Sequence, residues 1–358
     1  MRRLVVAFVV IVLVLPALLL ARPASAARMS AAPSRLSDVA SREDILGWIN
    51  SYRKKPDPDR VPVAMRGLSR LGLLNDPEGS GVYVGFLAGV LGANPSRAEA
   101  LIAKTLPLKP EHEWAIVRAV AYSGLPDWQK LLQRIADRMP ERRVMIEKLS
   151  TGKLPTLEHA QIEKDETLGE KLRGQFTLVK YFHKVTPEMK LDLTPDLLDT
   201  LWGYYYATAN YRPLSRIILM LRWTTERDVL EKLTLGNMAK YTLAINSARN
   251  PDLLASLKWA AAQKQPEGVA PVLKEVIEAA ETFETARLRN EALASIDELK
   301  RKGPGVKRDI SMWGQVGEGA LAVGCIVAAA TGHIELGLPC VVTGGISSAA
   351  LSFWDRQP

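Results

Sequence analysis

The sequence predicts an all-α protein. We expect an irregular α-solenoid or helical-hairpin repeat array in two lobes, plus a C-terminal apolar helical hairpin. Apolar residues recur at helical spacing, helix-start signals recur between them, and few stretches alternate with the period of two that marks a strand. A globular helical bundle is the alternative, because periodicity alone does not determine how the helices stack.

The N-terminal residues have the pattern of a secretory signal peptide. Two arginines precede an apolar run of seventeen residues, and Ala24-Ser25-Ala26 has the small residues that signal peptidase accepts. We therefore expect cleavage after Ala26 and removal of residues 1–26. An uncleaved membrane anchor is the alternative, because the apolar run approaches the roughly 20 residues that span a bilayer.

Composition and charge restrict the classes of function. Hydrophobic residues make up 47% of the chain, which is enough to bury a substantial core. Removing residues 1–26 takes away three arginines and no acidic residue, so the formal charge falls from +8 to +5. Because cationic and acidic residues are interspersed, this excess indicates a solvated surface, with no nucleic-acid partner and only a few contacts with anionic lipid.

Composition also predicts the domain boundaries. A charged, glycine-containing stretch separates two helical regions, and Gly303-Pro304-Gly305 ends the second region. The predicted segments are a linker at 27–36, an N-terminal lobe at 37–150, a charged hinge at 151–174, a C-terminal helical-repeat lobe at 175–302, a linker at 303–315 and an apolar Gly/Ala-rich hairpin at 316–354.

Several pairs of residues have the chemistry of helix starts. A capping side chain accepts a hydrogen bond from an otherwise unpaired N–H, and a following proline has no N–H to leave unpaired. Such pairs occur at Asn94-Pro95, Thr186-Pro187, Thr194-Pro195 and Asn250-Pro251. Two further sequences resemble capping boxes with aspartate at the third helical position. They are Ser41-x-x-Asp44 and Thr225-x-x-Asp228.

Between these starts, apolar residues fall on one helix face. One short series consists of Ile45, Ile49 and Tyr52, and a longer one of Val269, Val272, Leu273, Val276, Ile277, Ala280 and Phe283. Short helices joined by tight turns predict stacked hairpins, because one hairpin alone cannot bury its apolar face. Three stretches fit such a unit, at residues 94–124, 125–152 and 194–224.

One of these stretches resembles a tetratricopeptide repeat. In that family an apolar pair, a tyrosine one turn later, a small residue at the turn and a second tyrosine pack two helices together. The matching residues, within 198–214, are Leu198, Leu201, Tyr205, Ala209, Tyr211 and Leu214. Trp202 stands where the repeat usually has glycine, and Leu214 where it usually has alanine. Because these larger residues would force the helices apart, a HEAT-like or unrelated helical pair is the alternative.

A cluster of aromatic residues on the same stretch is the predicted partner-binding site. Because successive helical residues point about 100° apart, three consecutive tyrosines cannot all be buried on one face. An exposed ring in the groove of a repeat array would anchor a protein or peptide partner. The alternative is that the ring packs on a neighbouring loop. The candidate residues are Trp202, Tyr204, Tyr205, Tyr206 and Tyr211.

Three glycines four residues apart form a predicted helix-packing face. Gly81, Gly85 and Gly89 lie on one side of a helix, which allows another backbone to approach closely. This spacing is a frequent dimerisation device in membranes, but the apolar run here is short for a membrane span. We expect a tightly packed pair of helices inside the N-terminal lobe.

The apolar segment at 316–354 contains both cysteines of the chain. Its two uncharged runs, 319–332 and 336–354, are separated by His333 and Glu335. The segment could insert into a membrane as a hairpin, or it could form a buried cap on the helical stack. In an oxidising compartment a disulfide between Cys325 and Cys340 is plausible.

Catalytic and cofactor motifs are not recognisable in this sequence. The four histidines stand apart from one another, and neither they nor the two cysteines have the spacing of a zinc site. We therefore expect no catalytic residue, no metal and no cofactor. His112, which lies between two glutamates, is explained by acids that favour a helix start.

These patterns predict an exported, non-catalytic interaction or scaffold protein of the periplasm, associated with the inner membrane if the C-terminal hairpin anchors it. Its expected partner is a protein or peptide. The first alternative is a membrane-inserting protein that acts through the Gly-rich C-terminal hairpin. The second is a hydrolase or lyase whose site combines residues distant in the sequence.

Overall fold

A computed structural model describes residues 41–162, 190–226 and 229–284, together with residues 287, 288, 290, 291 and 294. Within these ranges the protein is predominantly helical and has no β-strand, so the predicted all-α class is confirmed for them. An isolated parallel bridge joins Ala160 to Leu191. The predicted signal peptide and the apolar segment 316–354, with Cys325 and Cys340, lie outside the described residues.

The helices are short and follow one another closely along the chain. The first group is α1 (Arg42–Tyr52), α2 (Val61–Arg70), α3 (Gly81–Ala93), α4 (Ala98–Thr105), α5 (Trp114–Tyr122), α6 (Trp128–Ile135) and α7 (Arg143–Ser150). The second group is α9 (Pro195–Thr208), α10 (Tyr211–Leu219), α11 (Leu230–Ala248), α12 (Pro251–Ala262) and α13 (Val269–Thr282). Short 3-10 helices occur between them, at η2 (Pro58–Arg60), η3 (Pro95–Arg97), η4 (Pro110–His112), η5 (Ala136–Arg138), η6 (Pro140–Arg142), η7 (Leu157–His159) and η9 (Met220–Thr225).

Two of the predicted helix caps form as expected. The Ser41 hydroxyl accepts a hydrogen bond from the backbone N–H of Asp44, and the Asp44 carboxylate accepts one from the N–H of Ser41. The Thr194 hydroxyl accepts from the N–H of Leu197 at 3.3 Å, which starts α9. These side chains satisfy donors that the first helical turn would otherwise leave unpaired.

The capping prediction at Thr225 is wrong, because Thr225 is the last residue of η9 and α11 starts only at Leu230. Asn94 precedes a helix as predicted but does not cap it. Its side-chain amide donates to the carbonyl oxygen of Val90, at the end of the preceding helix α3. A residue between two helices can thus serve the unpaired carbonyls of the first instead of the unpaired N–H groups of the second.

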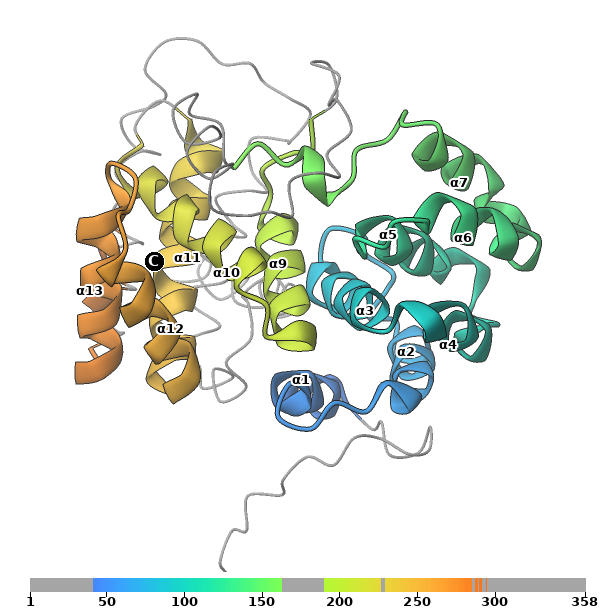
Figure 1. Ribbon diagram of the computed structural model, residues 1–358, viewed down its shortest axis with the longest axis horizontal. Coiled ribbons are helices and arrows are strands. Elements are labelled where there is room, and N and C mark those ends of the chain that lie inside the picture. Colours follow the sequence, from blue (N-terminus) through green and yellow to red (C-terminus); the bar gives the residue numbers. More distant parts are fainter. Residues whose placement is uncertain are drawn as a thin grey trace, which may run out of the picture.

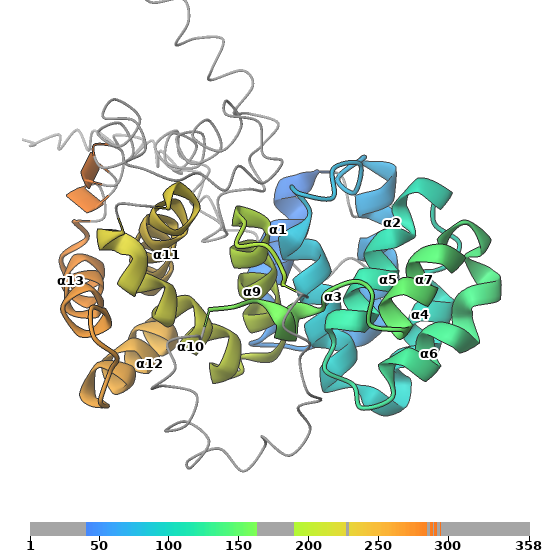
Figure 2. The same ribbon diagram turned by 90° about the horizontal axis from the view of Figure 1, so that it is seen from above.

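Helix α3 is the central helix of the fold. Every residue from Gly81 to Leu91 is buried. Figures 1 and 2 show α3 beside α9 at the centre, with α6 and α7 at one end of the molecule and α12 and α13 at the other. A helix that is apolar on all sides belongs in such a central place, because neighbours cover each of its faces.

The glycines of α3 lie directly against α9. Gly81 meets Asp196, Gly85 meets Thr200 and Gly89 meets Ala207, so the two helices run in parallel. A Cβ atom at Gly85 would clash with the Thr200 carbonyl oxygen, and one at Gly89 would lie 2.6 Å from the Ala207 Cβ atom.

Glycine also occurs on the α9 side of this contact. A Cβ atom at Gly203 would lie 2.7 Å from the backbone nitrogen of Phe86. Glycines from both helices therefore bring the two backbones together, as small residues do at other close helix crossings.

This contact joins the two predicted lobes into one hydrophobic core. Helix α3 belongs to the predicted N-terminal lobe and α9 to the predicted C-terminal lobe, yet one buried apolar cluster includes both. The first part of the predicted hinge is also attached to α10, because the Arg216 guanidinium donates to the carbonyl oxygens of Leu157 and Ala160, each at 3.0 Å. The described core therefore continues across the expected boundary.

Candidate functional site

Three of the five predicted partner-binding aromatic residues are buried, so the prediction is wrong for them. The exposed fraction is 0% for Trp202, 3% for Tyr205 and 1% for Tyr206. The physical reason is that α9 lies in the interior and has neighbours on several sides, including α1, α3, α10 and α11. A helix surrounded in this way can bury consecutive aromatic rings that point in different directions.

The buried rings form one packed cluster. Trp202 stacks on Tyr206 with ring centroids 5.8 Å apart, and its indole N–H donates to the Thr242 hydroxyl at 3.0 Å. The Tyr205 hydroxyl accepts a hydrogen bond of 2.8 Å from the guanidinium of Arg53, at the end of α1. These contacts stabilise the junction of α1, α9 and α11.

Tyr204 and Tyr211 are the two partly exposed members of the predicted set. The Tyr204 hydroxyl donates to the carbonyl oxygen of Ser123 at 2.9 Å, so this ring links α9 to the end of α5. Tyr211 begins α10 and packs against Trp259 of α12, with ring centroids 5.1 Å apart and planes at 90°. Of these two rings, Tyr211 is therefore the one whose partner is itself a surface residue.

Trp259 is a candidate binding residue that the sequence analysis missed. Its side chain is 55% exposed, although Leu253, Leu257 and Ala260 of the same helix are buried. Trp259 and Tyr211 together form an aromatic pair on the surface of α10 and α12. Only the position of Trp259 outside the buried series of α12 could have indicated this exposure from sequence.

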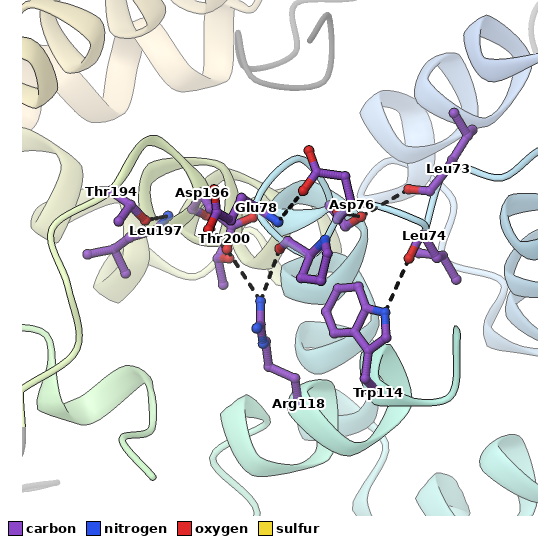
Figure 3. Close-up of polar contacts among 12 residues, drawn as sticks. Leu73, Leu74, Asp76, Glu78, Trp114, Arg118, Thr194, Asp196, Leu197 and Thr200 are labelled. Atoms are coloured by element: carbon purple, nitrogen blue, oxygen red, sulfur yellow. Dashed lines mark hydrogen bonds and ion pairs between the residues drawn. The ribbon is translucent and has the colours of Figure 1, made fainter. Parts of the chain in front are cut away.

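A second candidate site is a polar cluster at the start of α3 (Figure 3). The carboxylate of Asp196, in the first turn of α9, lies 3.6 Å from an Arg118 guanidinium nitrogen, and its side chain is only 16% exposed. The Arg118 guanidinium also donates to the carbonyl oxygen of Pro77 at 3.1 Å and lies 4.7 Å from the ring centroid of Trp114.

Asp196 also contacts the first residue of α3. The Asp196 carboxyl lies against Gly81, whose backbone N–H lowers the pKa of this carboxyl, while Ser80, which precedes α3, donates to the carbonyl oxygens of Leu73 and Asp76. An acidic side chain from α9 thus lies at the N-terminal end of α3.

The electrostatics of this cluster favour a protonated Asp196. Burial raises the pKa of its carboxyl from 3.8 to about 7, and the nearby acids Asp76 and Glu78 act in the same direction. Arg118 and the N–H of Gly81 oppose this shift without cancelling it. Burial and the neighbouring Asp76 also raise the pKa of Glu78. The contacts of the cluster join α3, α5 and α9, so we assign it a structural role.

His112 belongs to a buried network that the sequence did not reveal. Its Nδ1 atom lies 2.8 Å from the Ser69 hydroxyl, and its Nε2 atom lies 2.5 Å from the side-chain oxygen of Asn75. Burial lowers the pKa of His112, which favours the neutral ring. In that form Nε2–H donates to Asn75 and Nδ1 accepts from Ser69.

A serine that donates to histidine is also the arrangement of an activated nucleophile. Here the exposed fraction is 4% for Ser69 and 0% for His112. A substrate therefore cannot reach the hydroxyl in this conformation. We assign the network to packing, where it fixes α2 and the residues after it against η4.

Replacing Ser69 by alanine should destabilise the fold. The change leaves the buried Nδ1 atom of His112 without its donor, which costs about 1 to 3 kcal/mol. Urea unfolding at pH 8 measures this cost. Ser256→Ala is the control, because the partly exposed Ser256 hydroxyl donates only to the carbonyl oxygen of Asp252 in its own helix. Equal midpoints for the two variants would contradict a buried network.

Neither a metal site nor a membrane span is found in the described part of the chain. It holds no group of three or more histidine, cysteine, aspartate or glutamate side chains arranged for a metal ion. None of its helices is long and apolar enough to cross a bilayer. Comparisons of the chain with family models, with curated proteins and with solved structures find no match.

Proposed function

We propose that this chain is an exported, non-catalytic interaction protein that binds a protein or peptide partner through the aromatic pair Tyr211 and Trp259. The observation that carries the proposal is the 55% exposure of Trp259 beside Tyr211. Tryptophan and tyrosine are the side chains that most often dominate binding energy at protein interfaces. Small exposed residues, Ala255 and Ala262, lie one turn to either side of Trp259 and leave its ring accessible.

The proposal also includes the helical-repeat arrangement and the periplasmic location that the sequence predicts for this protein. Stacked helical hairpins, of which α9 and α10 form the tetratricopeptide-like pair, would present the aromatic pair on their surface. The signal-like N-terminus supports a periplasmic location, and the uncharged runs within 316–354 support attachment to the inner membrane. Fractionation of cells with alkaline extraction of the membrane tests the location separately from partner binding.

Cross-linking from α12 tests the aromatic pair. A photoreactive residue at Ala255, one turn before Trp259, should form an adduct with one defined protein in the producing cell. Trp259→Ala should reduce this adduct about tenfold or more, because loss of a central aromatic anchor commonly costs about 2 kcal/mol or more. The same photoreactive residue at exposed Glu278 of α13 controls for random collisions.

The outcomes separate binding from folding. The stability of Trp259→Ala should stay within about 1 kcal/mol of the parent, since a surface aromatic pair contributes little more. An Ala255 adduct that is unchanged by Trp259→Ala would contradict the proposal, as would identical adducts from Ala255 and Glu278. Loss of both the adduct and the fold would be resolved with Trp259→Phe, which keeps a ring and should restore both.

A further inference from the structure

Residues 128–153 form a strongly basic end of the molecule. This segment includes α6, α7 and the turns between them, and Figures 1 and 2 both place it at one end of the long axis. It contains seven lysine and arginine residues and three acidic residues, a net charge of +4 in 26 residues. The formal charge of the whole chain is +8, so half of the excess is concentrated here.

Four of these cations have no acidic partner among the described residues. The other three cations are arginines that form ion pairs: Arg134 with Glu99 at 2.8 Å, Arg142 with Glu141 at 3.6 Å and Arg143 with Asp137 at 2.7 Å. The four cations without an acidic partner are all exposed. They are Lys130, Arg138, Lys148 and Lys153.

An exposed aliphatic side chain lies within this basic segment. Val144 of α7 is 64% exposed, whereas Ile146 and Leu149 of the same helix are buried in the core. It follows Arg143 directly and precedes Lys148 by one turn of helix. Cations around an apolar side chain suit the boundary between lipid headgroups and acyl chains.

The opposite end of the molecule does not have the same uncompensated charge. Residues 265–284, which include α13, contain five glutamates and one lysine. Two of these glutamates are paired with lysines of neighbouring helices. Glu275 lies 2.7 Å from Lys240, and Glu281 forms an ion pair with Lys258 at 2.5 Å. The stronger uncompensated charge is therefore at the α6–α7 end.

We propose that the α6–α7 end, defined by Lys130, Arg138, Val144, Lys148 and Lys153, docks on anionic lipid headgroups. The four cations would neutralise the headgroup charge, and Val144 would enter the interface. Val144 favours a membrane over nucleic acid, because a phosphate backbone offers no apolar region for an aliphatic side chain.

This contact adds a second membrane attachment to the proposed function and does not depend on residues 316–354. Figures 1 and 2 place α10 and α12 in the other half of the molecule from α6 and α7. Docking through the basic end thus leaves the helices that carry Tyr211 and Trp259 in the half of the molecule away from the bilayer.

Vesicle co-sedimentation of the full mature chain tests this proposal. Vesicles of phosphatidylcholine with phosphatidylglycerol should bind the protein, and about 1 M salt should reverse this binding because it screens surface charge. Lys130→Glu combined with Lys148→Glu should weaken the binding about tenfold or more. The matched control is Lys264→Glu with Lys274→Glu, which changes the net charge equally at exposed positions of the opposite half.

The outcomes distinguish this surface from the other candidates. Val144→Ser should weaken binding to the anionic vesicles without changing net charge. Equal losses from both double variants would overturn the proposal, because net charge alone would then explain the binding. Tighter binding to a DNA oligonucleotide than to anionic vesicles would also overturn it. The protein could instead bind vesicles of pure phosphatidylcholine at high salt, and the Lys130/Lys148 variant could bind them equally well. That result would overturn the proposal and assign membrane attachment to residues 316–354.

Discussion

Gly85→Ala should be severely destabilising, with a loss of about 3 kcal/mol or more in the free energy of unfolding. The added methyl group would clash with the carbonyl oxygen of Thr200 and approach its Cα atom within 2.8 Å. Both atoms belong to the backbone of α9, so a rotamer change cannot relieve the clash. Overpacking of this kind usually costs about 1 to 3 kcal/mol and occasionally more. Alanine favours a helix by only about 1 kcal/mol over glycine.

Chemical unfolding followed by circular dichroism measures this loss, with Gly79→Ala as the matched control. A methyl group at Gly79 would meet only the carboxylate end of the exposed Asp76 side chain, at 2.9 Å. That variant should stay within about 0.5 kcal/mol of the parent. If Gly85→Ala were as stable as Gly79→Ala, α3 and α9 could not be in backbone contact.

Local signals in the sequence predicted many of the helices because their causes are local. The capping box at Ser41 and the cap at Thr194 involve side chains that bond to N–H groups three residues away. Most of the apolar series predicted for α13 is buried, namely Val269, Val272, Leu273, Val276 and Ala280. Ile277 is partly buried, and Phe283, which follows the last residue of the helix, is 73% exposed. Periodicity therefore identified the buried face of this helix, but it wrongly included Phe283 in that face.

Which helices pack against each other depends on the complementary shapes of their surfaces, and these shapes could not be predicted from the sequence. The glycine spacing indicated that α3 has a close neighbour, but not that this neighbour is α9, 115 positions further along from Gly81 to Asp196. The enclosure of α9 by α1, α10 and α11 in addition to α3 explains the wrong prediction for Trp202, Tyr205 and Tyr206. A helix expected to present rings to a groove is enclosed by other helices.

The candidate sites were harder to predict than the helices. No sequence motif singles out Asp196, because Arg118 and Gly81 approach it only in the folded chain. Trp259 is one of several apolar residues of α12, and its aromatic partner Tyr211 lies on a different helix. The pKa of a buried acid and the pairing of Trp259 with Tyr211 are properties of the assembled structure, so neither follows from spacing along the chain.

The stability of this protein should decrease as the pH rises through neutrality, and Asp196 should be a major cause. In the folded state the pKa of its carboxyl is about 7, against 3.8 for the ordinary group. The folded state therefore binds a proton that the unfolded state has already released between these values, which favours folding at lower pH. A shift of about three units corresponds to roughly 4 kcal/mol between pH 4 and pH 8.

Asp196→Asn should remove most of this dependence, since the amide has no proton to release. At pH 8 the variant should be more stable than the parent, because it avoids a buried carboxylate that Arg118 stabilises only partly. At pH 4 the two proteins should be similar. In the Arg118→Met variant, stability should fall more steeply above pH 6 than in the parent, because the variant lacks the cation that opposes the pKa shift of Asp196.

Unfolding midpoints at pH 4, 6 and 8 decide between two states of Asp196. If Asp196→Asn is less stable than the parent by the same amount at every pH, Asp196 is ionised throughout and acts as a negative charge at the start of α3. If the variant gains stability relative to the parent as the pH rises, the buried carboxyl holds a proton near neutrality. In that case the contact between α3 and α9, which joins the two halves of the core, weakens when Asp196 loses this proton.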